Sequence, residues 1–148
     1  MAARRSGLSR GEREYLNDLA KAIVMIRHGA VQMSHATGDG WGWFGSCAKC
    51  SKRRWLQWSH VEPQGRVPSL IWDTENACAL CAWCHKFWWH AFPREAEEWI
   101  IKRMGSAARS ALAFRGMFGR QKPDYHLIRI SLEQELGKLM HGRQPTFP

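Results

Sequence analysis

The chain has 148 residues, which is long enough to bury one hydrophobic core but too short for a catalytic domain joined to a second large module. Its net charge of +9 is spread along the whole length, and this favours a polyanionic partner such as nucleic acid. It has no apolar run long enough to cross a membrane and no apolar secretion signal near Met1, so we expect a cytoplasmic protein that does not enter membranes.

The N-terminal region, residues 1–46, predicts a basic arm, one helix and a loop. Ser9 and Glu12 have the spacing of a capping box, and apolar residues then recur at helical spacing, so we expect a helix from about 10 to 28. Residues 37–45 are rich in glycine and predict a loop. Its aromatic side chains either pack beneath the following region or reach toward DNA bases, and packing is favoured because exposed aromatic surface is costly.

The middle region, residues 47–92, is predicted to contain short elements, with a strand at 55–58 and a helix at 80–89. It also holds two Cys-x-x-Cys pairs with 30 residues between them, Cys47 with Cys50 and Cys81 with Cys84. Four converging thiolates satisfy tetrahedral zinc, so the spacing predicts a structural Zn²⁺ site rather than disulfides. Cys78 could replace Cys84 as the partner of Cys81. We favour Cys84, which leaves Cys78 as a small core residue.

The C-terminal region, residues 93–148, is predicted to be helical and to complete one compact domain. Pro93 suits the first turn of a helix and three glutamates follow it, so we expect a helix that ends at Gly105. A last helix is predicted to begin after Ser131, whose spacing to Gln134 resembles another capping box. Its buried stripe would consist of Leu132, Leu136 and Leu139.

Two groups of basic residues are candidates for DNA contact. The first group is Lys49, Lys52, Arg53 and Arg54. The second lies in an acid-free stretch near the C-terminal helices and consists of Lys102, Arg103, Arg109, Arg115, Arg120 and Lys122. This second group either forms a solvated helical face or follows DNA phosphates. In the latter case both groups would hold the DNA backbone without reading its sequence.

The order of residues in the middle region resembles that of the HNH nucleases. His60 and Asn76 lie between the two cysteine pairs, and His85 directly follows Cys84. The segments most similar to phage HNH proteins, and in particular to the Rap (NinG) recombination endonucleases of lambdoid phages, are 58–61, 70–76 and 81–86. The resemblance implies an α+β fold, with a zinc-braced ββα-metal core flanked by helices. It also implies a phage or prophage protein in the bacterial cytoplasm.

The resemblance implies metal-dependent hydrolysis of DNA. His60 would be the general base that activates water, and His85 would ligate a catalytic Mg²⁺ or Mn²⁺. Asn76 would fix the loop that orients His60. His90 is a second candidate ligand or simply a packed helix end. Its spacing of five residues from His85 differs from the four of one helical turn, so ligation would need a bend or a bridging water.

Ser59 stands just before His60, where many HNH sites place an acidic or histidine ligand. A hydroxyl is a poor ligand, so Asp73, Glu75, water or DNA phosphates would have to complete the site. The resemblance implies an endonuclease acting on branched or recombination-intermediate DNA. Two alternatives stay open: a non-catalytic zinc-containing DNA-binding or phage accessory protein, and a nicking or packaging nuclease without branch preference. A homodimer would suit symmetric junction cleavage, and exposed tryptophans would stack on unpaired bases.

Overall fold

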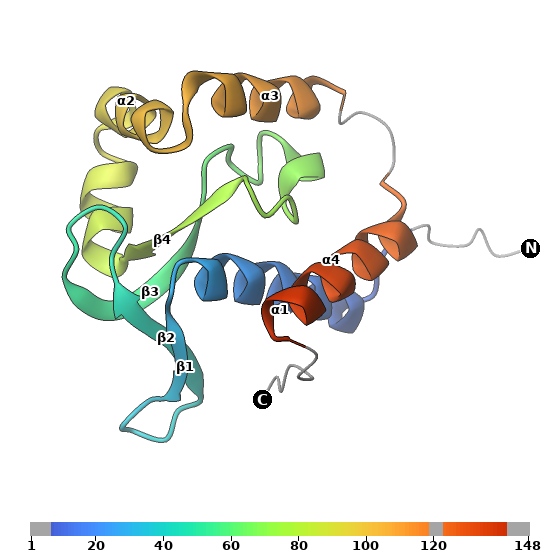
Figure 1. The fold of residues 1–148 in the computed structure, drawn as a ribbon, viewed down its shortest axis with the longest axis horizontal. Coiled ribbons are helices and arrows are strands. Elements are labelled where there is room, and N and C mark those ends of the chain that lie inside the picture. The colour runs from blue at the N-terminus through green and yellow to red at the C-terminus, as the bar shows by residue number, and fades with distance from the viewer. Residues whose placement is uncertain (1–6, 119–122, 142–148) are drawn as a thin grey trace, which may run out of the picture.

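The computed structural model describes residues 7–118 and 123–141, and its centre is a four-stranded antiparallel sheet in the order β1-β2-β3-β4 (Figure 1). The strands are β1 (Val31–Ser34), β2 (Trp41–Ser46), β3 (Arg53–His60) and β4 (Ala77–Cys81). The helices are α1 (Arg10–Arg27), η1 (Pro68–Leu70), η2 (Cys84–Trp89), α2 (Pro93–Met104), α3 (Ser106–Met117) and α4 (Tyr125–Leu139). The architecture is α+β, as predicted, with one helix before the sheet and the others after or between its strands.

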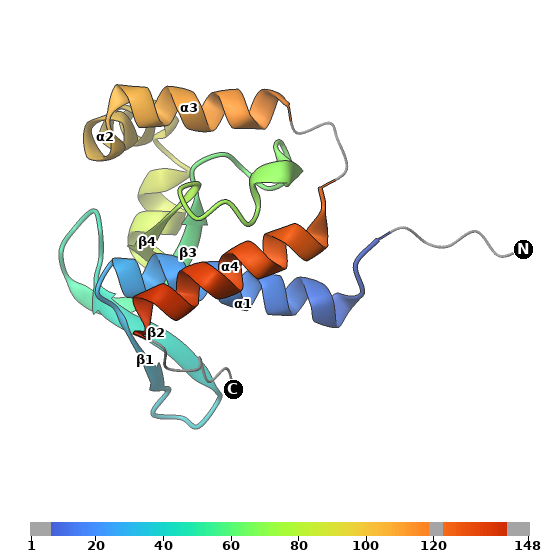
Figure 2. The ribbon, with the colours of Figure 1, turned by 45° about the vertical axis from the view of Figure 1, so that its right-hand side comes forward.

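Helix α1 belongs to two hydrophobic clusters and connects the sheet to α4. In both views α4 lies alongside α1 (Figures 1 and 2), and Ile23 of α1 shares a cluster with Leu136 of α4 and with Trp72. Further along the helix, Met25 packs in a second cluster with Leu80 of β4. All four aliphatic side chains are buried, so the sheet and α4 are held in place through the same helix.

Helices α1 and α2 agree with the sequence prediction. The Ser9 hydroxyl accepts from the Glu12 N–H at 3.2 Å and the Glu12 carboxylate accepts from the Ser9 N–H at 2.8 Å, so the predicted capping box is present. Helix α2 begins at Pro93 and ends before Gly105, whose φ of +89° lies in the region that favours glycine.

The prediction of a loop at residues 37–45 is wrong for most of that range, because β2 occupies residues 41–46. Gly38 and Gly40, with φ of +76° and +111°, form the turn before β2, whereas Gly42 and Gly45 serve close packing inside the strand. A Cβ atom on Gly42 would lie 2.8 Å from His35 Nε2 and 3.0 Å from the Trp55 ring. Likewise, a Cβ atom on Gly45 would lie 3.1 Å from the Cα atom of Ala30. The aromatic side chains of this segment therefore belong to a sheet and not to a free loop.

The helix predicted at residues 80–89 is correct only in its second half. Residues 77–81 form β4, and η2 begins at Cys84. Four of the five β4 side chains are buried, so the strand has no polar alternation to distinguish it from a buried helix. The strand predicted at 55–58 is present and extends to 53–60 as β3.

The last helix begins earlier than predicted. Asp124 caps α4 by accepting from the backbone N–H groups of His126 and Leu127, and Ser131 lies inside the helix. Leu132 and Leu136 are buried as expected. Within the described ranges, no helix is both long enough and apolar enough to span a membrane.

Candidate metal centre and histidine site

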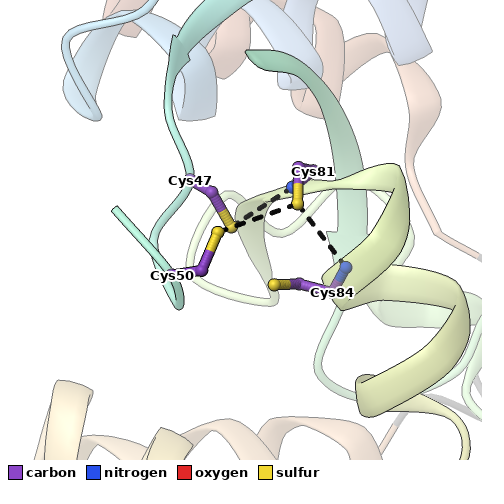
Figure 3. A group of neighbouring side chains, drawn as sticks. All are labelled: Cys47, Cys50, Cys81 and Cys84. Atoms are coloured by element: carbon purple, nitrogen blue, oxygen red, sulfur yellow. Dashed lines mark hydrogen bonds between the residues drawn. The ribbon is translucent and has the colours of Figure 1, made fainter. Parts of the chain in front are cut away.

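The four predicted zinc ligands come together. The sulfur atoms of Cys47, Cys50, Cys81 and Cys84 all lie within 4.8 Å of one another and point toward a common centre (Figure 3). All five cysteines are free of disulfides. Sulfurs bound to one tetrahedral zinc at about 2.3 Å would be about 3.8 Å apart. The observed separation of 4.0 Å between Cys50 Sγ and Cys81 Sγ fits that arrangement.

Backbone geometry turns both cysteine pairs inward. Directly after the first pair, Ser51 has a φ of +61° and its N–H donates to the Cys47 carbonyl at 2.9 Å, which closes a tight turn around Cys47 and Cys50. The Cys81 N–H donates to Cys47 Sγ at 3.3 Å and the Cys84 N–H to Cys81 Sγ at 3.5 Å. Such N–H···S bonds favour a thiolate over a thiol and suit a metal ligand.

The pKa of Cys47 shows the effect of these bonds. Burial alone would raise the pKa of this thiol, but backbone N–H groups of Cys50, Cys81 and Lys49 lower it to about 7. Burial and the neighbouring sulfurs raise the pKa of Cys84. A bound cation would favour the thiolate form of all four ligands.

Cys78 lies outside this cluster, as predicted. It pairs with Ser59 across the β3–β4 ladder, three positions before Cys81, so the alternation of a strand directs the two cysteine side chains to opposite faces. Cys78 is 5% exposed and belongs to the hydrophobic core, and burial raises the pKa of its thiol to about 12. A neutral buried thiol is a packing residue and not a ligand.

His60 ends β3 beside the start of β4. Its Nε2 lies 3.0 Å from the Ile71 carbonyl oxygen and its Nδ1 lies 3.2 Å from the Gln64 side-chain nitrogen. A carbonyl oxygen accepts only, so Nε2 carries the proton and Nδ1 keeps its lone pair. Burial lowers the pKa of His60, which keeps the imidazole neutral near pH 7 and able to accept a proton.

Asn76 fastens the loop that carries these contacts. The side chain is fully buried, and its Oδ1 accepts from the Glu62 N–H at 2.7 Å. Its Nδ2 donates to the carbonyls of Glu62 and Leu70, at 3.1 and 3.0 Å. Leu70 directly precedes Ile71, whose carbonyl bonds His60. The amide therefore bonds both ends of the segment that carries the Ile71 carbonyl.

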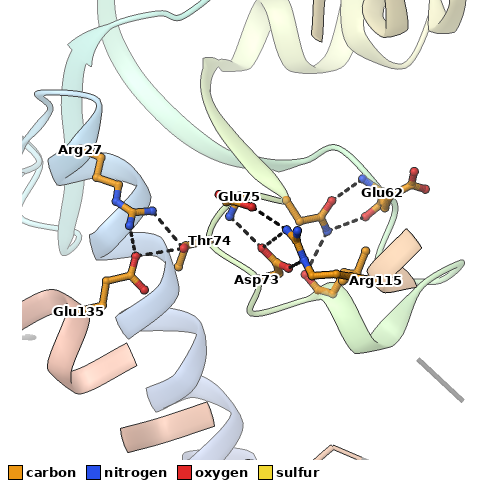
Figure 4. A network of polar contacts seen from close by, with 9 residues as sticks. Arg27, Glu62, Asp73, Thr74, Glu75, Arg115 and Glu135 are labelled. Atoms are coloured by element: carbon orange, nitrogen blue, oxygen red, sulfur yellow. Dashed lines mark hydrogen bonds and ion pairs between the residues drawn. The ribbon is translucent and has the colours of Figure 1, made fainter. Parts of the chain in front are cut away.

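Charged side chains hold the same loop from outside (Figure 4). Arg115 of α3 donates to Asp73 and Glu75, at 2.8 Å to each. Next to them, Arg27 of α1 pairs with Glu135 of α4 and donates to Thr74 at 3.1 Å. Both Asp73 and Glu75 therefore bind the Arg115 guanidinium. From the sequence alone, the same two residues are candidate ligands of the catalytic cation.

The rings of His85, near the start of η2, and His90, directly after its end, face each other. Their Nε2 atoms lie 3.1 Å apart, close to the distance of about 3 Å expected for two nitrogens on adjacent positions of one cation. The helix here is a π-helix, in which the backbone bond spans five residues instead of four. The spacing of five that appeared too long for an α-helix therefore places both rings on one side, without a bridging water.

Gln57 of β3 orients His85 and was not predicted as a site residue. Its Oε1 lies 2.7 Å from His85 Nδ1, so Nδ1 donates and Nε2 is left as the ligand nitrogen. Burial lowers the pKa of His85, and the charges of His90 and His60 lower it further. Because Gln57 has no motif spacing to a histidine, only its side-chain contact with His85 in the folded chain could reveal it.

Ser59 contributes no ligand. The side chain is fully buried, and its hydroxyl donates to the Gln57 carbonyl at 3.3 Å. The histidine site therefore offers two imidazole ligands and a separate candidate base, and further cation positions would be filled by water or phosphate.

The predicted DNA-contact residues divide into three sets. The exposed members are Lys49, Lys52, Arg53, Arg54, Lys102 and Arg103. Arg109 and Arg115 are engaged within the chain, since Arg109 donates to Glu62 at 2.7 Å and to Glu97 at 2.9 Å. Arg120 and Lys122 lie outside the described residues. The exposed set has cationic groups available for a phosphate backbone, whereas the two engaged arginines hold acidic side chains of the protein.

Comparison with protein-family models, with curated proteins and with solved structures found no match for this chain.

Proposed function

We propose that this protein is a metal-dependent DNA endonuclease of the HNH type, related to the phage Rap (NinG) recombination endonucleases. The observation that carries the proposal is the arrangement around β3, β4 and η2. Two antiparallel strands are followed by a short helix, with His60 at the end of β3 and Asn76 just before β4. His85 lies on η2, directly after Cys84 of the cysteine cluster, and His90 directly follows the end of η2. This is the order expected of a zinc-braced ββα-metal site.

Different side chains would perform different parts of phosphodiester hydrolysis. His60 Nδ1 is unprotonated, while the Ile71 carbonyl holds the ring by its other nitrogen, so this residue can accept a proton from an attacking water. The Nε2 atoms of His85 and His90 would hold Mg²⁺ or Mn²⁺. A cation there would stabilise charge on the phosphate and the leaving oxygen. Asn76 keeps the base in position through the loop it bonds.

The exposed basic residues support DNA as the substrate. Lys49, Lys52, Arg53 and Arg54 lie beside the cysteine cluster and at the start of β3, the strand that carries His60. Lys49 Nζ lies 4.4 Å from the centroid of the Trp88 ring, so the cation is held against the helix that carries His85. Backbone contacts made here would bring a phosphate to the histidines without selecting a sequence.

The test is cleavage by wild type, His60→Ala and a control variant, His126→Ala, whose exposed side chain lies on α4. Duplex, flap and four-way-junction DNA are incubated with Mg²⁺, with Mn²⁺ or with chelator. We expect wild type and His126→Ala to cleave when the cation is present. His60→Ala should lose about 10²–10⁴-fold in rate, since it lacks a general base, while its DNA affinity is unchanged.

One observation favours the alternative of a non-catalytic DNA-binding protein. Ser59 is buried and bonded to the chain, so the position before the base supplies no third ligand. This alternative predicts that wild type cleaves none of the three substrates with either cation, or that His60→Ala matches wild type in every activity. Either result would overturn the nuclease proposal.

A further inference from the structure

A cavity of about 530 Å³ lies between α1 and the first three strands of the sheet, and it reaches η2. The residues that line it are Asp18, Lys21, Gln32, Trp41, Gly42, Trp43, Leu56, Gln57, Trp58 and His85. Its volume lies within the range of about 300–1,000 Å³ that is usual for sites of small organic ligands. Three of the nine tryptophans in the chain contribute to this one space.

The cavity adjoins both parts of the candidate histidine site. His85 forms part of its wall, and so does Gln57, which bonds His85 Nδ1 at 2.7 Å. Trp58 lines the cavity, and its ring also contacts that of His60, with 4.3 Å between the ring centroids and an angle of 56° between the ring planes. A group bound in the cavity would therefore lie next to any phosphate held at the histidines.

The walls suit a flat aromatic ring with polar edges. Trp41 presents 55% of its surface to solvent, which is costly for so large an apolar side chain unless something covers it. At the rim, Asp18, Lys21 and Gln32 are half-buried, and none of the three makes a side-chain hydrogen bond or ion pair within the described part of the chain. Indole faces stack on bases of any identity, and unpaired carboxylate, ammonium and amide groups can bond base edges.

A base inside a regular duplex would first have to be unstacked and unpaired, which costs a few kcal/mol. The cavity therefore favours a base that is already unpaired, as in a bulge, a flap or the centre of a junction. The net charge of +9 and the exposed lysines and arginines beside β3 favour a nucleotide that is part of a polyanionic strand.

We propose that this cavity receives an unpaired nucleobase of the DNA strand whose phosphate lies at the histidine site. The inference rests on the proposed nuclease function for the position of the phosphate. In this arrangement the base stacks on Trp41, Trp43 and Trp58. Its polar edge forms hydrogen bonds with Asp18, Lys21 and Gln32.

The experiment measures binding and not cleavage, with zinc-loaded full-length protein in chelator-free buffer without Mg²⁺ or Mn²⁺. Three duplexes of one sequence are compared: one with a single adenine bulge, one with an abasic bulge and one without a bulge. We expect the adenine bulge to bind about tenfold more tightly than the abasic bulge, since stacking one base is worth about 1–3 kcal/mol. In Trp41→Ala this difference should disappear, and in Trp41→Phe most of it should return.

Trp83→Ala is the matched control, because Trp83 is 58% exposed, as Trp41 is 55% exposed, but does not line the cavity. It should keep the tenfold preference. If wild-type protein bound the adenine bulge and the abasic bulge with equal affinity, that result alone would overturn the inference. The inference would also be overturned if free deoxyadenosine monophosphate displaced the bulged DNA at an equal concentration. The cavity would then be a site for a free nucleotide and not for a base of a DNA strand. Absence of cleavage with either cation would refute the nuclease function instead, so the two failures are separate.

Discussion

The cysteine cluster and the histidine site lie next to each other, but the chain builds them in different ways. Each cysteine pair is closed by a local turn, with Cys47 and Cys50 before β3 and Cys81 and Cys84 at the end of β4. The histidine site depends on a longer segment, residues 61–76, which is held from several elements. The first site needs two short turns brought together, and the second needs the whole fold.

This difference indicates which site tolerates change. The cysteine cluster joins the turn after β2 to the β4–η2 junction, so a metal there would hold the sheet and the short helix together. The histidine geometry then depends on that support and on polar contacts such as those of Asn76. Loss of the cluster should therefore disturb both sites, whereas loss of a contact at the histidines should leave the cluster intact.

The largest effect is expected from the cysteine cluster. Cys81→Ala should abolish binding of one Zn²⁺ per chain and unfold at least the sheet, because structural zinc sites contribute on the order of 10 kcal/mol. This is comparable with the whole stability of a domain, about 5–15 kcal/mol. Zinc content by mass spectrometry and thermal unfolding by circular dichroism check the result.

Cys78→Ala is the control for that measurement. Cys78 and Cys81 are both buried in β4, 5% and 1% exposed, but Cys78 belongs to the core and not to the cluster. Cys78→Ala should keep its zinc and lose about 1 kcal/mol of stability. If Cys78→Ala released zinc and Cys81→Ala retained it, the assignment of the four ligands would be wrong.

A smaller effect is expected from Gln57, which orients one ligand of the histidine site. Gln57→Ala should lower the affinity for Mn²⁺ about 10–100-fold, because His85 would lose the acceptor that fixes its tautomer. Gln57→Glu, which keeps an acceptor, should restore most of it. Electron paramagnetic resonance of Mn²⁺ in zinc-loaded protein gives the affinity.

Gln134→Ala, an exposed glutamine on α4, serves as the matched control and should bind Mn²⁺ as wild type does. The zinc content of all these variants should be unchanged, which separates the two sites. Mn²⁺ binding that survives Gln57→Ala in full would remove Gln57 from the site.

How much could be predicted from the sequence follows from how local each feature is. The Ser9 capping box, the ends of α2 and the cysteine ligands are set by residues a few positions apart, and all were predicted. Strand β2 was missed because its glycines fit against neighbouring strands, as at Gly42, and no local pattern shows that fit. Strand β4 was missed, and its last two residues were predicted as the start of a helix, because burial on both faces removes the alternation of a strand.

The candidate site was predictable in its residues but not in its contacts. The motif order placed His60, Asn76 and His85, but the π-helix that brings His90 to His85 depends on backbone bonding within η2. Charge counting grouped Arg109 with the exposed cations, whereas its carboxylate partners come from distant parts of the chain. Long-range partners of this kind leave no periodic signal in one sequence.

The smallest effect concerns the titration of His60 itself. Burial disfavours the charged imidazole and the Ile71 carbonyl only partly offsets this, so the pKa of His60 is lower than the ordinary histidine value of 6.5. The base is active when unprotonated, so kcat/KM should rise with pH along an acid limb that lies below pH 6.5. Proton–nitrogen NMR of the ring, assigned by the signal missing in His60→Ala, measures the same ionisation without DNA. A midpoint at or above 6.5 would mean that the ring is solvated in solution, and the contacts to Ile71 and Gln64 would then not be what holds the base.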